Sequence, residues 1–162
     1  MRNTYPFALA LILATAIGVA SAPLPGFAAG GGGSVSTPSR QEADYDKAVK
    51  LVKAEKYRDA IDLLQKVVQK EPRNADAWNY LGYSQRKTGQ MDVALASYNK
   101  ALDIDPRHLG AHEYLGELYL QVNDLPKAEA LLKKLSAMCD RCEQRQDLEK
   151  AVAAYKKAKG IS

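Results

Sequence analysis

The sequence predicts an all-α protein, a solenoid of three helical hairpins followed by one further helix that caps its carboxyl end. Three observations support this prediction. After Arg40, alanine, leucine, lysine, glutamate and glutamine dominate, and these residues favour helices. Apolar side chains recur three and four positions apart, which is the spacing of one helix face. Similar segments also return every 34 residues, and a fixed period of this length is typical of stacked helical repeats.

Residues 1–28 are expected to be a secretory signal peptide. A positive start precedes the apolar run Phe7–Ala20, and small residues and prolines follow. The run is too short to cross a ~30 Å hydrocarbon core, so an uncleaved membrane anchor is the weaker alternative. Cleavage after Ala22 and after Ala28 both fit, and we favour Ala28 because Pro23 would otherwise be the first mature residue. Export to a periplasm is therefore predicted, with no membrane insertion after cleavage.

Residues 29–40 are expected to form a flexible linker rich in glycine and serine, since they carry almost nothing that could build a core. Loss of Arg2 with the signal peptide would lower the formal charge from +4 to +3. Charges of both signs are spread evenly along the chain. Without a basic stripe or patch, we expect no nucleic-acid partner.

The repeat is clearest between Ala75 and Pro106. Its marker residues are Trp78, Leu81, Gly82, Ala94, Tyr98, Ala101 and Pro106. A shift of 34 residues forward gives His112, Leu115, Gly116, Tyr119, Ala128 and Leu132, and the same shift backward gives Ala48, Leu51, Ala60, Leu64, Val67 and Pro72. This pattern resembles the tetratricopeptide repeat family, whose unit is a helical hairpin. The resemblance covers residues 41–140 and implies repeats at about 41–74, 75–108 and 109–142.

Each marker position has a physical purpose in a helical hairpin. Small residues let the two helices approach closely, and they are Ala48, Gly82 and Gly116 on the first helices and Ala60, Ala94 and Ala128 on the second. Pro72 and Pro106 end the second helices, because proline cannot continue a helix interior. Gly89 is placed to leave its helix with positive φ.

The repeats also depart from the family pattern. Repeat 1 has Asp44 and Lys47 where the family prefers Trp and Leu, and terminal repeats are often atypical because one face meets solvent. Repeat 2 has Gln85 in place of Tyr. Repeat 3 has His112 in the Trp position and ends in Asp140 rather than Pro.

Residues 143–159 are expected to form the capping helix. One face is apolar and the other is charged, which suits a helix covering the open end of a stack. The apolar face carries Leu148, Ala151, Val152 and Tyr155. With three hairpins, this makes seven helices.

Cys139 and Cys142 form the one short motif with possible chemistry. The favoured interpretation is a structural disulfide that replaces the missing proline turn, since close cysteines pair in an oxidising compartment. A redox-active pair lacks the strand of a thioredoxin-like setting, and haem attachment would need a histidine at Glu143. A zinc site would need two more ligands, for which only His108 and His112 are candidates.

The resemblance implies that the first helix of each hairpin lines a concave face. The candidate partner-binding residues on that face are Tyr45, Asn79, Tyr80, Tyr83, Arg86, Glu113, Tyr114 and Glu117. Tyr80 and Tyr114 are expected to be exposed there, and Tyr98 and Tyr119 to pack in the core. Arg86 is expected towards one side, with Lys87, and Glu113 and Glu117 towards the other.

Some members of the family hold the carboxylate of a peptide's end with a clamp of Lys, Asn and Arg. The matching residues here are Tyr45, Val49, Tyr80, Gly110 and Tyr114. The clamp is therefore absent, and the binding of such peptide tails does not carry over. A tyrosine-lined surface remains, and tyrosine is enriched in binding sites because its large ring keeps a hydroxyl for hydrogen bonding.

The predicted function is a protein-interaction adaptor of the bacterial cell envelope, whose partner is another protein or a peptide segment. An obligate accessory subunit of an envelope complex is one alternative, and a thiol–disulfide protein using Cys139 and Cys142 is another. We expect no enzyme, cofactor or metal site, because no catalytic set of Ser, His and Asp and no phosphate-binding loop is present. The sequence predicts no particular oligomeric state.

Overall fold

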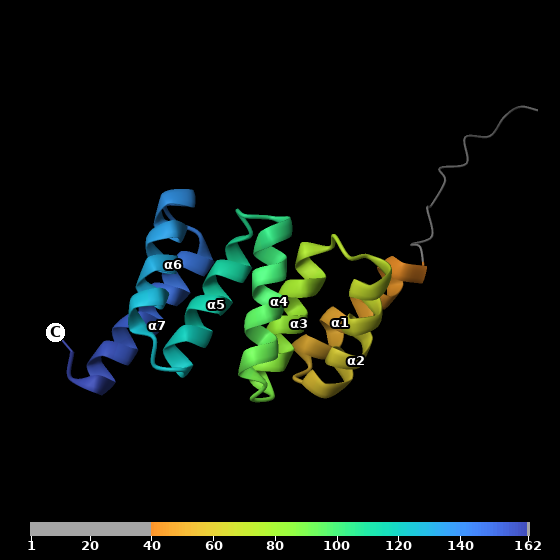
Figure 1. The fold of residues 1–162 in the computed structure, drawn as a ribbon, viewed down its shortest axis with the longest axis horizontal. Coiled ribbons are helices and arrows are strands. Elements are labelled where there is room, and N and C mark those ends of the chain that lie inside the picture. Colours follow the sequence, from red (N-terminus) through yellow and green to blue (C-terminus); the bar gives the residue numbers. More distant parts are fainter. Residues whose placement is uncertain (1–39, 162) are drawn as a thin grey trace, which may run out of the picture. The chain divides into compact units, whose positions relative to one another are not determined.

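The structure is a computed structural model that describes residues 40–161. The expected signal peptide, its cleavage positions and nearly all of the expected linker lie outside the described residues. Seven α-helices occupy this part of the chain, and it contains no strand (Figure 1). They are α1 (Arg40–Lys53), α2 (Tyr57–Lys70), α3 (Ala75–Lys87), α4 (Met91–Ile104), α5 (Leu109–Gln121), α6 (Leu125–Met138) and α7 (Glu143–Lys159). The predicted all-α solenoid is confirmed.

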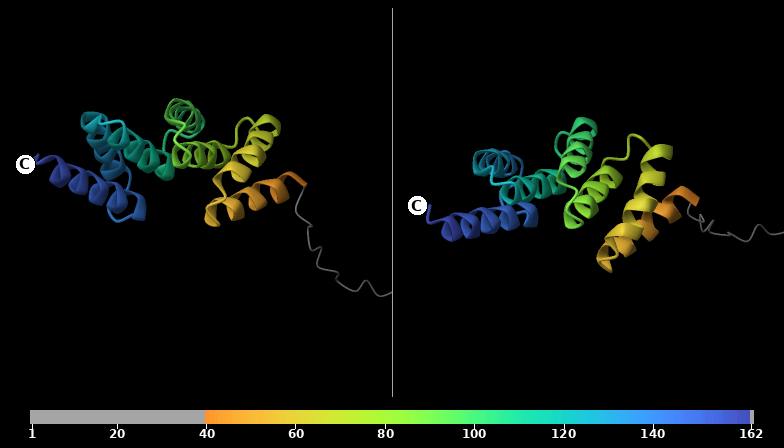
Figure 2. Two further views of the ribbon diagram at one scale, coloured as in Figure 1. Left: turned by 90° about the horizontal axis from the view of Figure 1, so that it is seen from below. Right: turned by 60° about the horizontal axis from the view of Figure 1, so that its bottom comes forward.

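The helices pack as three hairpins, α1 with α2, α3 with α4 and α5 with α6, and each second helix also packs against the next first helix. Figure 2 shows this succession from two further directions. Within residues 40–161, no helix is both long enough and apolar enough to cross a membrane.

The turn inside each hairpin has the same backbone geometry. Glu55, Gly89 and Asn123 stand 34 residues apart and adopt positive φ angles of 56°, 82° and 62°. At Gly89 this was expected from the sequence. The next residue of each turn closes a hydrogen bond back into the first helix, as from the N–H of Gln90 to the carbonyl of Gln85 at 2.9 Å. This is a left-handed helix end of the kind that glycine and asparagine favour.

The joints between repeats are also alike. The side chain of Asn74 accepts a hydrogen bond from the N–H of Ala77 at the start of α3, and Nδ1 of His108 accepts one from Ala111 at the start of α5. The indole N–H of Trp78 donates to the carbonyl of Pro72 at 3.1 Å. His112 stands in the same position of the next repeat, and its Nε2 makes the same bond to the carbonyl of Pro106, at 3.0 Å. The histidine therefore replaces the tryptophan without loss of this contact.

The core follows the predicted marker positions. Ala48, Ala60, Ala94 and Ala128 are completely buried, as is Tyr98. Buried side chains form one cluster over α1 to α3 and a second over α4 to α7. Because each repeat contacts only its neighbours, the core extends along the stack.

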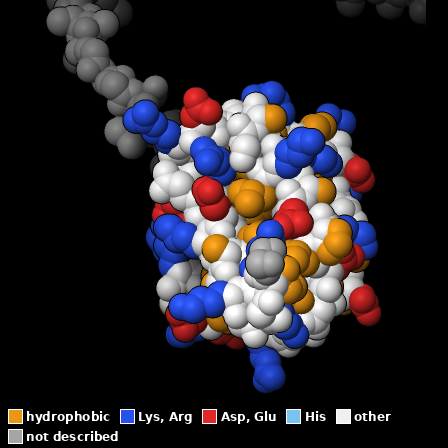
Figure 3. Space-filling model, turned by 90° about the vertical axis from the view of Figure 1, so that its left-hand side faces the viewer, with side chains coloured by type: hydrophobic (Ala, Val, Ile, Leu, Met, Phe, Trp, Pro, Cys, Tyr) orange, Lys and Arg blue, Asp and Glu red, His pale blue; other side chains and the backbone are white. Residues whose placement is uncertain are grey.

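Helix α7 is packed tightly onto α5 as well as α6. Leu148 of α7 is completely buried, and a Cβ built on Gly116 of α5 would lie only 2.6 Å from its methyl carbons. Figure 3 views this end of the stack, where charged side chains surround a few apolar ones. The outward surface of this end is thus largely polar, as a cap requires.

Cys139 follows α6 directly and Cys142 directly precedes α7. Their Cα atoms are 5.8 Å apart and the sulfur atoms lie at bonding distance, so the backbone brings the pair to the separation that a disulfide requires. The side chain of Arg145 donates a hydrogen bond to the carbonyl of Asp140 in the same junction.

Candidate functional site

A row of tyrosines runs across the first helices of the hairpins. Tyr45 of α1 lies 6.2 Å from Tyr80 of α3, measured between ring centroids. Tyr83 of α3 lies 4.7 Å from Tyr114 of α5. All four rings are half-buried, so each keeps some surface for a partner. We call these four residues the tyrosine row.

The hydroxyl groups of Tyr45 and Tyr114 stay protonated at neutral pH. Burial is the main cause that raises the pKa of both Tyr45 and Tyr114 above the ordinary value for tyrosine. Nearby carboxylates act in the same direction, with Asp76 beside Tyr45 and Glu113 beside Tyr114. At these two positions a partner would therefore meet an aromatic ring with a neutral hydroxyl.

Tyr57 joins this aromatic set, although the sequence analysis did not select it. It stands at the first position of α2, and its ring centroid lies 6.0 Å from that of Tyr83. A second-helix residue was not expected on this face. The turn that ends at Lys56 places Tyr57 on this face. The repeat pattern of the sequence does not predict a tyrosine at this position.

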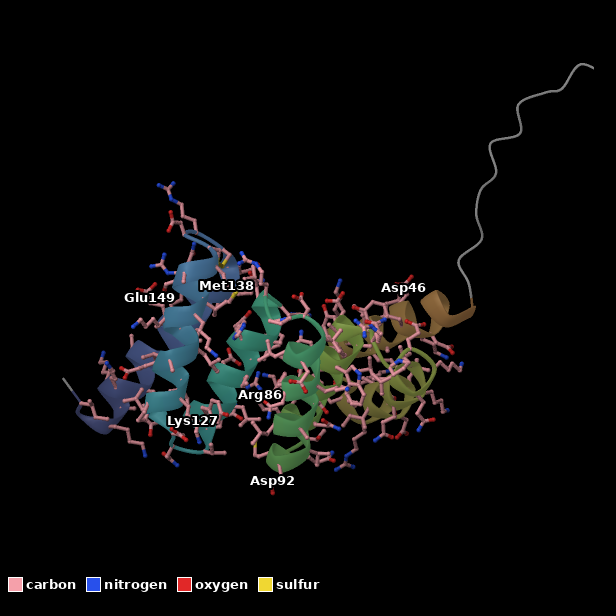
Figure 4. The ribbon with its side chains drawn as sticks, turned by 45° about the horizontal axis from the view of Figure 1, so that its top comes forward. Asp46, Arg86, Asp92, Lys127, Met138 and Glu149 are labelled. Carbon is pink, nitrogen blue, oxygen red and sulfur yellow. A yellow bond between two sulfur atoms is a disulfide. The ribbon has the colours of Figure 1, made fainter. Side chains whose placement is uncertain are left out.

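Arg86 and Glu117 are close partners, which corrects the expectation that they lie on opposite sides of the groove. One guanidinium nitrogen of Arg86 lies 2.5 Å from a carboxylate oxygen of Glu117. Arg86 is only 4% exposed, and Figure 4 shows it between helices in the middle of the stack. The two residues are 31 positions apart, so α3 and α5 must pack before they can meet.

Several groups stabilise the positive charge of Arg86. Burial opposes the charge, but the Tyr98 oxygen and the Glu117 carboxylate outweigh burial and raise the pKa of the guanidinium. Its Nε donates to the Tyr98 hydroxyl at 3.4 Å. The Cζ atom of the Arg86 guanidinium also lies 5.3 Å from the ring centroid of Tyr83 and 5.9 Å from that of Tyr114. Arg86 therefore supports the tyrosine row from beneath by cation–π contact and offers no exposed charge.

Asn79 and Glu113 are also buried, so two more of the expected groove residues belong to the packing of the stack. Asn79 keeps a side-chain oxygen without a hydrogen-bond partner in the described part of the chain. Burial raises the pKa of Glu113 to about 8, and the carboxylates of Glu117, Asp147 and Glu143 add to this effect. Helix α7 contributes to this effect, since Asp147 and Glu143 belong to that helix.

The histidines and cysteines are engaged in structure. His108 places its Nε2 3.0 Å from Asp76, and burial lowers the pKa of His112. Over residues 40–161 no group of three or more histidine, cysteine and carboxylate side chains is placed to hold a metal ion. The tyrosine row offers a partner aromatic area and hydroxyl groups on the first helices of the hairpins.

Comparison with known families gives two matches. Family models described as tetratricopeptide repeat match residues 45–108 and 85–138. The chain is 32% identical over 104 residues to tetratricopeptide repeat protein 37 of Xenopus laevis, which covers 57% of this chain and 7% of that protein. This chain therefore spans a small fraction of the length of that relative.

Solved structures share the fold. The Yersinia enterocolitica type III secretion chaperone SycD, in complex with a peptide of the translocator YopD, aligns with a TM-score of 0.65 and 22% identity. This alignment covers 77% of this chain and 95% of SycD. The first repeat domain of Spaghetti bound to an HSP90 peptide aligns with a TM-score of 0.66 and 16% identity, covering 75% of this chain and 94% of that domain.

Proposed function

The chain belongs to the tetratricopeptide repeat family, and on this basis we propose that it is a protein-interaction scaffold of the bacterial cell envelope. Its site is the tyrosine row, which binds a segment of a partner protein. The fold supports binding rather than catalysis, since repeat proteins of this kind use their extended faces for recognition.

The observation that carries the proposal is the continuity of the tyrosine row. Tyr45, Tyr80 and Tyr114 come from three successive hairpins, and Tyr83 connects the last two. Their rings sit on helices that pack directly against one another, so they are held before a partner arrives. A preformed aromatic surface loses little conformational entropy on binding.

The structural neighbours support a peptide ligand. SycD is seen with a peptide of YopD, and the Spaghetti domain with a peptide of HSP90. In this chain none of the positions that match the carboxylate clamp holds Lys, Asn or Arg, and the guanidinium of Arg86 is already paired with Glu117. We therefore propose that the partner is held by an internal segment with apolar and hydrogen-bonding side chains, not by an acidic carboxyl terminus.

In-cell crosslinking followed by affinity capture tests this function. The wild-type chain is compared with the variant Tyr45→Ala/Tyr80→Ala/Tyr114→Ala, after circular dichroism has shown that the helix content of the variant is normal. Tyrosine is enriched among the interface residues whose truncation costs about 2 kcal/mol or more, so we expect capture to fall at least about tenfold. A partner captured equally by both chains would overturn the assignment of the site.

Two further variants act as controls. Tyr45→Phe/Tyr80→Phe/Tyr114→Phe keeps the rings, and it separates ring contact from hydroxyl hydrogen bonding. Lys133→Ala/Ser136→Ala/Glu149→Ala changes exposed residues on α6 and α7 and should capture the partner as the wild type does.

The envelope location is supported by the signal-like amino-terminal sequence and is tested separately. Cell fractionation should find the protein in the periplasm, and sequencing of its amino terminus should show cleavage after Ala28. A full-length protein in the cytoplasm would contradict the location while leaving the binding site open to the capture experiment.

A further inference from the structure

A second surface involves the second helices of the first two hairpins. A trough of about 580 Å³ runs between α2 and α4, and α3 forms its floor. It is lined by Gln65, Val68, Gln69, Trp78, Leu81, Gln85, Val93, Ala96, Ser97 and Lys100. None of these residues belongs to the tyrosine row. We call this feature the outer trough.

The next repeat shows how the outer trough arises. The matching trough between α4 and α6 has a volume of only about 250 Å³. There Tyr119 stands where Gln85 stands in the outer trough, and Leu131 stands where Ser97 stands. The two larger side chains fill space that the smaller pair leaves open. Gln85 and Ser97 thus contribute to the larger volume of the outer trough, and Gln85 was visible in the sequence as a departure of repeat 2.

The floor of the outer trough offers a hydrogen-bond donor. The Ser97 hydroxyl donates to the amide oxygen of Gln85 at 2.7 Å, and both side chains are at least 95% buried. The amide nitrogen of Gln85 makes no hydrogen bond to any residue from 40 to 161. A ligand in the outer trough that accepts a hydrogen bond from this nitrogen would therefore gain a polar contact on the floor.

The walls define the rest of the ligand. Val68, Trp78 and Leu81 present an apolar inner wall, and Val93 on the rim is 49% exposed. Lys100 is an exposed cation on the same rim, and among residues 40–161 no aspartate or glutamate lines the trough. The complementary ligand therefore has an apolar body and a neighbouring negative charge.

We propose that the outer trough is a second docking surface, which accepts one bulky apolar side chain of a partner protein's helix while an acidic residue of that helix meets Lys100. A groove between two helices suits an amphipathic helix. Half of the lining residues, including Gln65, Ala96 and Lys100, are exposed to solvent. A free small molecule would thus stay largely in water, whereas a helix would cover its own anchor residue.

Trp78 is the single tryptophan of the chain, so its fluorescence reports on the outer trough directly. The probe is a short alanine-rich helical peptide that carries one central phenylalanine, a glutamate one turn away, and no tryptophan or tyrosine. Titration into the full helical protein should change the Trp78 emission in a saturable way. Replacing the phenylalanine by alanine should weaken binding at least about tenfold, and replacing the glutamate by lysine should weaken it up to about fivefold.

Matched variants test whether the peptide sits in the outer trough. Gln85→Tyr/Ser97→Leu installs the residues of the next repeat, and after its helix content and thermal unfolding are checked it should lose the response. Lys100→Glu should weaken the wild-type peptide and strengthen the lysine peptide. Lys134→Glu, at the same position one repeat on, should leave both unchanged. Tyr80→Ala/Tyr114→Ala should also leave binding unchanged, which separates this surface from the tyrosine row.

Three results would overturn the proposal. One is the absence of any Trp78 response to the phenylalanine–glutamate peptide up to millimolar concentration. Another is an equal response of the filled variant Gln85→Tyr/Ser97→Leu. The third is binding of free 3-phenylpropionate without binding of the peptide, which would make the outer trough a small-molecule site instead.

Discussion

Two glycines at the same position of successive repeats have different neighbours. A Cβ on Gly82 would lie 2.8 Å from the ring of Tyr98, which belongs to the same hairpin. A Cβ on Gly116 would lie 2.6 Å from the methyl carbons of Leu148, which belongs to α7. In the second case Leu132 occupies the position of Tyr98 and is only partly buried.

The difference shows how a stack of near-identical units comes to an end. A tyrosine fills the space above Gly82 from within its own repeat and also holds Arg86. Leu132 stands at the same position of the next repeat and leaves the space above Gly116 open. Leu148 of α7 occupies this space. The same approach brings Glu143 and Asp147 towards Glu113, so close packing of the cap is accompanied by an electrostatic cost.

The largest effect is expected at Tyr98. Tyr98→Ala should lower the free energy of unfolding by about 3–5 kcal/mol, because it removes a fully buried ring and a hydrogen-bond partner of Arg86. Leu132→Ala is the matched change one repeat on and should cost about 1–2 kcal/mol, since Leu132 is only partly buried. Denaturant unfolding measures both, and equal costs would contradict the different roles of the two positions.

The contact between Gly116 and Leu148 should appear as coupling. Leu148→Ala should cost about 2–4 kcal/mol. Gly116→Ala should cost about 1–3 kcal/mol because its new methyl group meets Leu148. In the double variant the methyl group has space, so the combined cost should be clearly less than the sum.

The control for this cycle is Gly82→Ala, which meets Tyr98 instead. Its cost should simply add to that of Leu148→Ala. Additive costs for the Gly116 pair as well would show that α7 does not depend on this glycine.

Glu113 should make stability depend on pH. Its folded pKa of about 8 lies above the ordinary value of 4.5, so the folded protein favours the protonated form. The stabilising contribution is complete below about pH 4.5 and is lost as pH rises through 8. Glu113→Gln should flatten this slope and stabilise the protein at pH 9 by on the order of 2 kcal/mol.

Thermal unfolding between pH 5 and 9 measures the effect. Glu117→Gln is the matched control: it breaks the pair with Arg86 and should not be stabilising. An unchanged pH slope in Glu113→Gln would show that the carboxyl is not held in its protonated form by the packing of α7.

The smallest effect is expected at the junction of α6 and α7. A disulfide between Cys139 and Cys142 closes a short loop and should stabilise the protein by at most about 2 kcal/mol. Adding reductant should remove this contribution from the wild type and leave Cys139→Ser/Cys142→Ser unchanged. If mass spectrometry of the purified protein finds free thiols, the predicted disulfide would be wrong. The hydrogen bond from Arg145 to Asp140 would then connect the loop to α7.

Local features of the fold could be predicted because the residues that determine them lie within one repeat. Three kinds of residue act within one hairpin or at its joint with the next. They are the helix formers, the small residues Ala60, Ala94 and Ala128, and the helix-ending prolines Pro72 and Pro106. Gly89 was predicted to adopt positive φ from its place in a turn, and it does. The position of His112 in a packing slot was likewise readable from the period, and its bond to Pro106 follows from the same geometry.

The sequence by itself therefore determined the repeat, the seven helices and the tyrosines that line the first helices, because periodic spacing encodes which face of a helix each residue occupies. Only the tertiary structure decided that Arg86 is paired with Glu117, that Glu113 is buried, and that the outer trough is open between α2 and α4. These features depend on which side chain fills the space between neighbouring repeats. That choice is made by volume and charge across about 30 residues of chain, and no local pattern records it.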